Sequence, residues 1–171
     1  MIQVSLGVER AVDSASDPLG RARVGWAEGM SESELYNVAR GTWVLSHARA
    51  VKEKFLLVSG DGIVRQAIEI GSVAKAADGR LVFDGRVLGS GHPVFDAFVG
   101  KPAPNGAQQN PITYFDSALE HTGCACDCGE LVSPPREFIT GHDQRAIHER
   151  ITKVGTVRQF LDWFDETWAH G

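Results

Sequence analysis

The feature that most constrains this chain is a group of three closely spaced cysteines, Cys124, Cys126 and Cys128, followed by His142. Cysteine thiolates and imidazole are the ligands that zinc prefers, and a closed structural zinc site needs four of them. In a reducing compartment such spacing is more typical of a metal site than of a disulfide framework. The pattern therefore predicts that structural zinc binds Cys124, Cys126, Cys128 and His142.

Alternate residues point the same way only in an extended backbone, so the loop must bend for three sulfurs to meet one ion. Gly123 and Gly129 flank the cysteines and supply that freedom. His142 belongs to a separate segment, so a metal ion would tie two parts of the tail together. His121 and His148 are the alternative fourth ligands.

Other interpretations of this cluster are weaker. The cysteines could be plain thiols, but three of them beside histidines favour a metal. A zinc deaminase would carry a His-x-Glu motif and a Cys-x-x-Cys pair, and neither occurs in that arrangement. The adjacent His142 and Asp143 are also typical of metal-dependent phosphohydrolases of the HD type, but these need a helical bundle, which the upstream sequence does not indicate.

Upstream of the cysteines, the sequence indicates short strands separated by turns, as the 19 glycines and seven prolines suggest. Ser31 and Glu34 form a capping box that predicts the start of a helix. We expect an α+β fold with a small β-barrel and flanking helices. The strands are expected at residues 1–8, 42–45, 54–59, 63–70, 81–83 and 112–115.

The composition changes near Ser117, which predicts a barrel domain over residues 1–116 and a second region over 117–171. In this second region, Thr156 begins an amphipathic helix with one apolar stripe. Trp163 and Trp168 are expected to pack within it. We therefore predict a zinc-bound helical tail.

The bulk properties restrict location and partners. The formal net charge of −5 argues against a nonspecific DNA-coating protein, although a local basic groove remains compatible with it. The apolar runs are too short to cross a membrane, and residues 1–10 do not look like a secretory signal. A cytoplasmic protein without a membrane partner is expected.

Two stretches resemble known families. Residues 34–43, 54–70 and 110–114 resemble bacterial PUA-like domains, the group that includes EVE and ASCH domains and the modified-base readers of some restriction endonucleases. This resemblance covers roughly residues 1–116. Separately, Cys124–Gly129 with Phe138–Asp143 resembles a short cysteine-and-GHD element of bacterial and phage proteins, whose cysteines and histidine are suspected metal ligands.

The PUA-like resemblance implies a β-barrel that binds DNA or RNA, often by accepting one base, possibly a modified one, in a pocket. Such a pocket needs an aromatic face and polar groups for the base edge. Trp26 and Trp43 are the stacking candidates, Arg40 and Arg65 the phosphate contacts, and Asn110 the base contact. Each also has a structural interpretation: Trp43 as core, Arg40 at a helix end and Asn110 in a turn.

The sequence leaves two other functions open. Some ASCH-type proteins hydrolyse modified nucleosides with a lysine, a threonine and a glutamate, for which Lys54, Thr42 and Glu69 are candidates here. A protein-interaction adaptor that uses the zinc-bound tail is the third possibility. No phosphate loop or catalytic triad pattern is visible. We therefore predict nucleic-acid recognition rather than catalysis.

Overall fold

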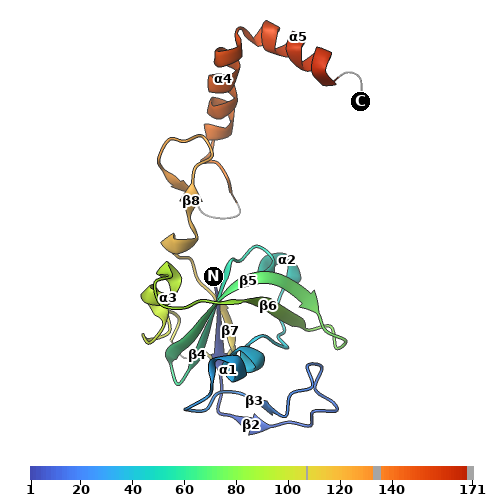
Figure 1. Ribbon diagram of the computed structural model, residues 1–171, viewed down its shortest axis with the longest axis vertical. Helices are drawn as coiled ribbons and strands as arrows, with labels where there is room; N and C mark the ends of the chain where they lie inside the picture. The colour runs from blue at the N-terminus through green and yellow to red at the C-terminus, as the bar shows by residue number, and fades with distance from the viewer. Residues whose placement is uncertain (107, 133–135, 169–171) are drawn as a thin grey trace. The chain divides into compact units, whose positions relative to one another are not determined.

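The computed structural model describes residues 1–106, 108–132 and 136–168. The chain divides into two compact units, Met1–Glu120 and His121–Gly171 (Figure 1). Each unit is described by itself below.

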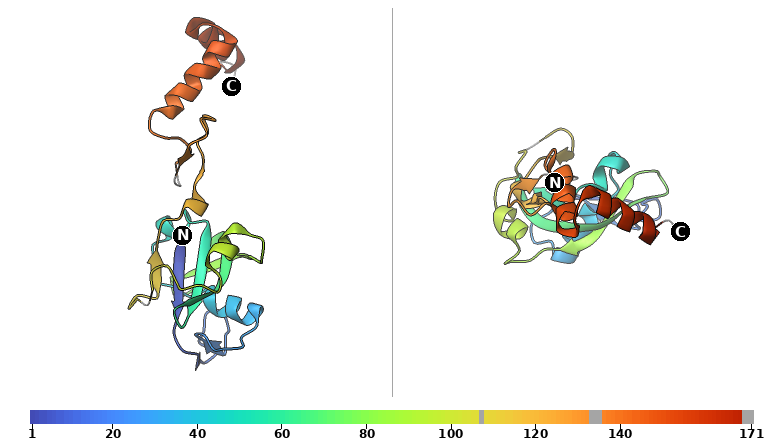
Figure 2. Two further views of the ribbon diagram at one scale, coloured as in Figure 1. Left: turned by 90° about the vertical axis from the view of Figure 1, so that its left-hand side faces the viewer. Right: turned by 90° about the horizontal axis from the view of Figure 1, so that it is seen from above.

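The first unit contains a five-stranded sheet with the strand order β6-β5-β4-β1-β7. The strands β4 (Phe55–Gly60), β5 (Ile63–Lys75) and β6 (Leu81–Val87) form an antiparallel meander. Next to β4, β1 (Ile2–Leu6) runs parallel to it, as Figure 2 shows, and pairs on its other side with antiparallel β7 (Ile112–Tyr114).

Local chemistry explains two bends in this sheet. The β4–β5 turn places Asp61 and Gly62 at positive φ, 51° and 71°, as a tight hairpin turn requires. Further along, the β5–β6 register shifts between Ile70 and Ser72. At Gly85 on β6, a Cβ atom would lie 2.1 Å from the Glu69 carbonyl oxygen, so this close approach of the two strands requires glycine.

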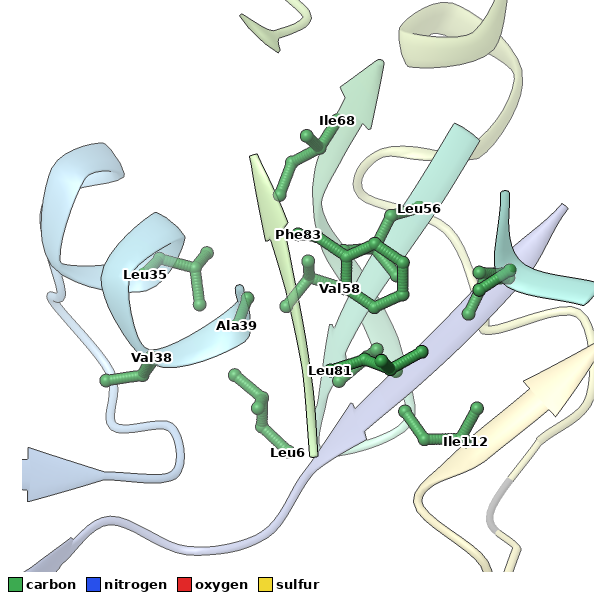
Figure 3. Packing of buried hydrophobic residues seen from close by; sticks show 13 residues of the cluster. Leu6, Leu35, Val38, Ala39, Leu56, Val58, Ile68, Leu81, Phe83 and Ile112 are labelled. Atoms are coloured by element: carbon green, nitrogen blue, oxygen red, sulfur yellow. The ribbon is translucent and has the colours of Figure 1, made fainter. Parts of the chain in front are cut away.

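Both faces of the sheet are covered. On one face, side chains of all five strands pack with helices α1 (Glu32–Ala39) and α2 (His47–Ala50) (Figure 3). On the other face, a second apolar cluster packs against α3 (Pro93–Phe98). The first cluster comprises Ile2, Val4, Leu6, Leu35, Val38, Ala39, Ala50, Leu56, Val58, Ile68, Leu81, Phe83 and Ile112, and the second Met1, Phe55, Leu57, Val64, Ala67, Leu88, Val94 and Ala103.

This arrangement overturns the expected PUA-like β-barrel: the sheet is open, and no closed barrel is found in the described residues. The physical reason lies in the two apolar clusters. A small barrel buries one face of its sheet in a single interior, whereas here β4 sends Leu56 and Val58 into one core and Phe55 and Leu57 into another. The α+β content is as expected, but the closure is not.

The individual helices and strands agree better with the sequence-based expectations than the closure of the sheet does. Helix α1 begins at the predicted capping box, where Glu34 N donates to Ser31 Oγ and Ser31 N donates to Glu34 Oε2. The expected strand over 42–45 is reduced to one bridge, between Trp43 and Leu81. A small hairpin, β2 (Arg10–Ala11) with β3 (Arg23–Val24), and a 3₁₀ turn, η1 (Ala118–Glu120), complete the unit.

The second unit begins with a hairpin of β8 (Thr122–Gly123) and β9 (Leu131–Val132). Two helices follow, α4 (His142–Val154) and α5 (Val157–Trp168), and α5 lies where the sequence predicted an amphipathic helix. No helix in the described part of the chain is long and apolar enough to cross a membrane.

Candidate metal centre and a cleft beside Trp43

Three cysteines and one histidine of the second unit converge on one point. His142 Nδ1 lies 3.8 Å from Cys124 Sγ, 3.3 Å from Cys126 Sγ and 3.5 Å from Cys128 Sγ. The sulfurs of Cys124 and Cys126 are 3.4 Å apart, and all four atoms lie within 4.8 Å of one another. These four residues, which the sequence pattern selected together, could hold a metal ion.

The loop that carries the cysteines is bent by its own backbone. Asp127 N donates to the Cys124 carbonyl oxygen at 2.9 Å, and Cys124 N donates to the Glu130 carbonyl oxygen at 2.8 Å. Asp127 and Gly129 take positive φ values of 62° and 83°, whereas Gly123, the other expected hinge, lies in β8. The bend therefore comes from left-handed residues between and after the cysteines.

The histidine arrives from a separate segment, as expected. His142 is the first residue of α4, and its backbone N–H donates to the Ile139 carbonyl oxygen at 2.9 Å. Gly141 precedes it at a φ of 84°, a left-handed turn that favours glycine. Ile139 N in turn donates to Cys124 Sγ at 3.4 Å, so this turn also contacts a sulfur directly.

The centre is the small core of its unit. Cys124 and Cys126 are buried with Ala146 of α4, and Phe138 and Ile139 pack against them. Within the described residues, neither alternative fourth ligand, His121 or His148, joins the group of four.

The thiols have unequal acidity. Burial opposes ionisation of Cys124, but hydrogen bonds from the Cys126 and Ile139 backbone and from the Cys126 and His142 side chains lower its pKa to about 6. Burial and the neighbouring sulfurs of Cys124 and Cys128 raise the pKa of Cys126 to about 11. Sulfurs packed so closely repel one another once ionised, and a cation between them would relieve that repulsion.

A cleft of about 500 Å³ opens in the first unit beside Trp43. Trp43 and its neighbour Thr42 form part of the wall. The half-buried indole packs against the first apolar cluster, and its Nε1 donates to the Ala39 carbonyl oxygen at 2.7 Å. Trp43 is therefore fixed in orientation while it borders open space.

Charges of both signs line this cleft in equal number: Arg10, Arg21, Arg80, Asp13, Asp17 and Asp78. Arg21 pairs with Asp17 at 2.8 Å, and Arg80 lies 3.7 Å from Asp78. In the described part of the chain, Arg10 has no ion-pair partner. Because the charges balance, the cleft suits a polar ligand of low charge better than a polyanion.

Two of the predicted nucleic-acid contacts have local partners. Arg40 forms an ion pair with Asp84 at 2.6 Å, and its carbonyl oxygen accepts from Phe83 N of β6. Asn110 Oδ1 accepts from Ile112 N at 3.0 Å, which holds the turn that leads into β7. The Asn110 contact is the structural role that the sequence left open. Arg40 is the C-cap residue of α1, as the alternative interpretation held, and its ion pair with Asp84 comes in addition.

The other two predicted nucleic-acid contacts, Trp26 and Arg65, lie next to each other. The Arg65 guanidinium sits 4.4 Å from the centroid of the Trp26 ring, and Arg65 Nε donates to the Gly60 carbonyl oxygen at 3.2 Å. A Cβ atom at Gly60 would lie 2.4 Å from the same ring, so the indole rests directly on the strand backbone. Trp26 is thus engaged by Gly60 and Arg65 in this structure.

Of the three candidate catalytic residues, Thr42 is not brought together with the other two. Lys54 and Glu69 lie near each other, since Ile70 N donates to the Lys54 carbonyl oxygen at 2.8 Å and Phe55 pairs with Glu69. Glu69 of β5 pairs with Arg86 at 2.7 Å, near the end of β6. Thr42 precedes Trp43, which bridges to Leu81 at the opposite end of the same strand. Thr42 therefore lies beside the start of β6 and Glu69 beside its end, too far apart to act on the same atom.

The sequence predicted Trp43 as the wall of a pocket but missed the charged residues that line this cleft. Its arginines come from β2, the loop between β2 and β3, and the turn before β6, and only folding brings these segments together. A partial signal was present in Asp17 and Arg21, an i,i+4 pair of opposite charge.

Comparison with protein families, with characterised proteins and with solved structures finds no match to this chain.

Proposed function

We propose that the second unit is a zinc-binding module in which Cys124, Cys126, Cys128 and His142 hold one structural zinc ion. Zn–S bonds of about 2.3 Å and Zn–N bonds of about 2.0 Å in a tetrahedron place neighbouring ligand atoms roughly 3.5–3.8 Å apart. The distances of 3.3–3.8 Å from His142 Nδ1 to the three sulfurs fit this size. This convergence of four ligand atoms is the observation that carries the proposal.

The chemistry of the ligands supports zinc over harder ions. Three thiolates and an imidazole are soft to borderline donors, which disfavour magnesium and calcium. Four protein ligands complete a tetrahedron and leave no position for a substrate, as is typical of structural sites. Zinc would supply charge compensation for the thiolates and a cross-link between the β8–β9 loop and α4.

Elemental analysis of the purified chain tests this proposal. We expect about one zinc ion per chain, and Cys126→Ser should reduce that value severalfold because only three ligands remain. His148→Ala is the matched control, since His148 lies outside the group of four. A chain that retains no zinc when purified without chelator, and does not bind added zinc, would refute the proposal.

We further propose that the first unit recognises nucleic acid by accepting an unmodified or a modified base in the cleft beside Trp43. The cleft volume of about 500 Å³ lies within the range of roughly 300–1,000 Å³ typical of small-ligand sites. Trp43 offers an aromatic wall, and the balanced arginines and aspartates offer donors and acceptors for a base edge. Phosphate contacts fall to Arg10, whose guanidinium has no ion-pair partner among the described residues.

This second proposal rests on the cleft and on the resemblance of residues 1–116 to PUA-like proteins. The open sheet removes the barrel from that resemblance, so the cleft now carries the argument. Catalysis is not proposed, because Thr42 lies beside the start of β6 and Glu69 of β5 lies beside its end.

Binding of short single-stranded DNA and RNA, with and without methylated bases, at two salt concentrations tests base recognition. We expect binding that strengthens at low salt, and a loss of about tenfold for Arg80→Ala at the cleft. Arg86→Ala is the matched control, because Arg86 pairs with Glu69 at the far end of the same strand. If none of these oligonucleotides binds at low salt, the proposal is wrong.

A further inference from the structure

Helix α5 presents an uncovered apolar face. Five of its apolar residues, at positions 157, 160, 161, 164 and 168, lie on one side of the helix. Trp163 is also exposed and lies beside this stripe, with its ring centroid 5.8 Å from that of Phe160. None of its residues is buried: Leu161 is 48% exposed, Phe164 45% and Trp168 66%. Surface apolar residues are common singly, but a continuous stripe of this kind marks an interaction surface.

The stripe is ordered as a ridge of rings. The ring centroids of Phe160 and Phe164 lie 6.2 Å apart, and those of Phe164 and Trp168 lie 6.4 Å apart. A helix of 12 residues with no buried face has marginal stability in water, because helix nucleation is costly. The helix therefore gains stability from whatever covers this ridge.

The charges beside the ridge indicate what covers it. Arg158 and Asp165 are two helical turns apart and flank the same side of the stripe. Asp162, which pairs with Arg158 at 3.2 Å within the helix, and Glu166 lie further round on the polar face. The helix is acidic overall, with one arginine against three carboxylates. This charge disfavours an anionic membrane surface or a nucleic acid as the occupant.

We propose that α5 docks against α5 of a second copy of this chain, antiparallel and through the apolar ridge. In an antiparallel pair, like flanks face each other, so Arg158 meets the partner's Asp165 and Asp165 meets the partner's Arg158. A two-fold symmetric interface forms each contact twice, which makes this arrangement self-complementary. A parallel pair would instead set this flank against the opposite flank of the partner helix, which carries Trp163 and Thr167 and offers no charge to pair with it.

The proposal is independent of both proposed functions, because it uses no metal ligand and no residue of the cleft. It predicts that the full chain, loaded with zinc, is a dimer in sedimentation equilibrium at micromolar concentrations. It also predicts that the helical signal in circular dichroism grows with protein concentration as α5 is covered.

Leu161→Glu places a charge in the centre of the ridge in both copies. Because two leucines then leave the interface, we expect the dissociation constant to rise at least about 100-fold. Glu166→Gln is the matched control on the polar face, away from the Arg158–Asp162 pair, and its dissociation constant should stay within about threefold of the original. Circular dichroism and retained zinc show whether each variant still folds.

A charge exchange tests the antiparallel geometry. Arg158→Asp alone and Asp165→Arg alone should each weaken the dimer by roughly 3- to 30-fold, because two surface pairs are lost each time. The double variant restores both pairs and should recover most of the affinity. Failure of this recovery would overturn the antiparallel arrangement.

A chain that stays monomeric up to about 100 µM would overturn the proposal as a whole, since a dimer held only at higher concentration is too weak for a built interface. Binding of the monomer to phosphatidylserine vesicles through Leu161 would likewise overturn it, in favour of a membrane occupant. A mass that is unchanged by Leu161→Glu in an existing dimer would place the interface elsewhere.

Discussion

The two units of this chain differ in the residues that form their cores. The first unit buries large side chains such as Phe83, Leu56 and Ile68 on a sheet covered on both faces. Among the described residues of the second unit, the buried apolar positions are few: Cys124, Cys126, Val132 and Ala146. Two of these four are metal-ligand candidates, so the core of the second unit and its metal centre are largely the same residues.

This contrast follows from size. A segment as short as residues 121–171 buries too little apolar surface to offset its conformational entropy, and such segments commonly rely on a metal, disulfides or association. Its cysteines are free in the structure, which leaves the metal centre and the α5 ridge as the sources of order. Residues 1–120 need neither.

Removal of the metal should have the largest effect, and it should destabilise the second unit and spare the first. We expect a chelator to abolish amide protection in α4, because structural zinc in small domains contributes on the order of 10 kcal/mol to folding. Protection in β4 should persist, since its core contains no metal ligand. Hydrogen exchange measured segment by segment checks this, and simultaneous loss in both segments would contradict it.

Phe83→Ala should act on the other unit. Phe83 is 1% exposed in the first cluster, and truncating such a side chain costs about 3–5 kcal/mol. Denaturant unfolding followed at Trp26 and Trp43 would measure the loss, with zinc content unchanged. Val44→Ala is the control: Val44 is 76% exposed, so its effect should stay within about 0.5 kcal/mol.

Asp17 should make the first unit sensitive to acid. Hydrogen bonds from the Arg21 side chain lower the pKa of Asp17 from 3.8 to about 2, although burial opposes the shift. Because the folded pKa lies below the unfolded pKa, this stabilisation is complete above about pH 4 and is lost as the pH falls towards 2. Asp17→Asn should cost about 1–2 kcal/mol at pH 7.

The pH dependence of unfolding tests directly whether Asp17 is the group that titrates. Denaturation curves between pH 5 and pH 2 should converge for the original chain and Asp17→Asn as Asp17 becomes protonated. Curves that keep a constant separation would show that Asp17 does not titrate in this window.

The capping box of α1 should have the smallest effect. Ser31→Ala removes the acceptor for Glu34 N, and loss of such a cap costs about 1 kcal/mol. Ser33→Ala in the same turn is the matched control, because the backbone cap uses Ser31 and Glu34. Equal destabilisation by both variants, measured by thermal unfolding, would contradict the capping role.

Local patterns predicted most of the secondary structure. The Ser31 capping box, the Gly60–Gly62 turn and the apolar stripe after Thr156 each depend on residues within one or two turns of one another, and each lies where expected. The cleft could not be predicted in this way, since Arg10 and Arg80 are brought together only by the fold. Trp26 and Arg65, predicted as separate contacts, meet each other for the same reason.

What the sequence by itself determined is which four residues could hold a metal ion. The spacing of the cysteines lets one bent loop collect three sulfurs, so only His142 had to come from elsewhere. The tertiary structure alone decided that the sheet is open. The pairing of β1 with β4 joins residues more than fifty positions apart, and it places the apolar face of β1 in the first cluster while β4 contributes to both clusters. Such a choice depends on the packing of the whole unit, and no local pattern contains it.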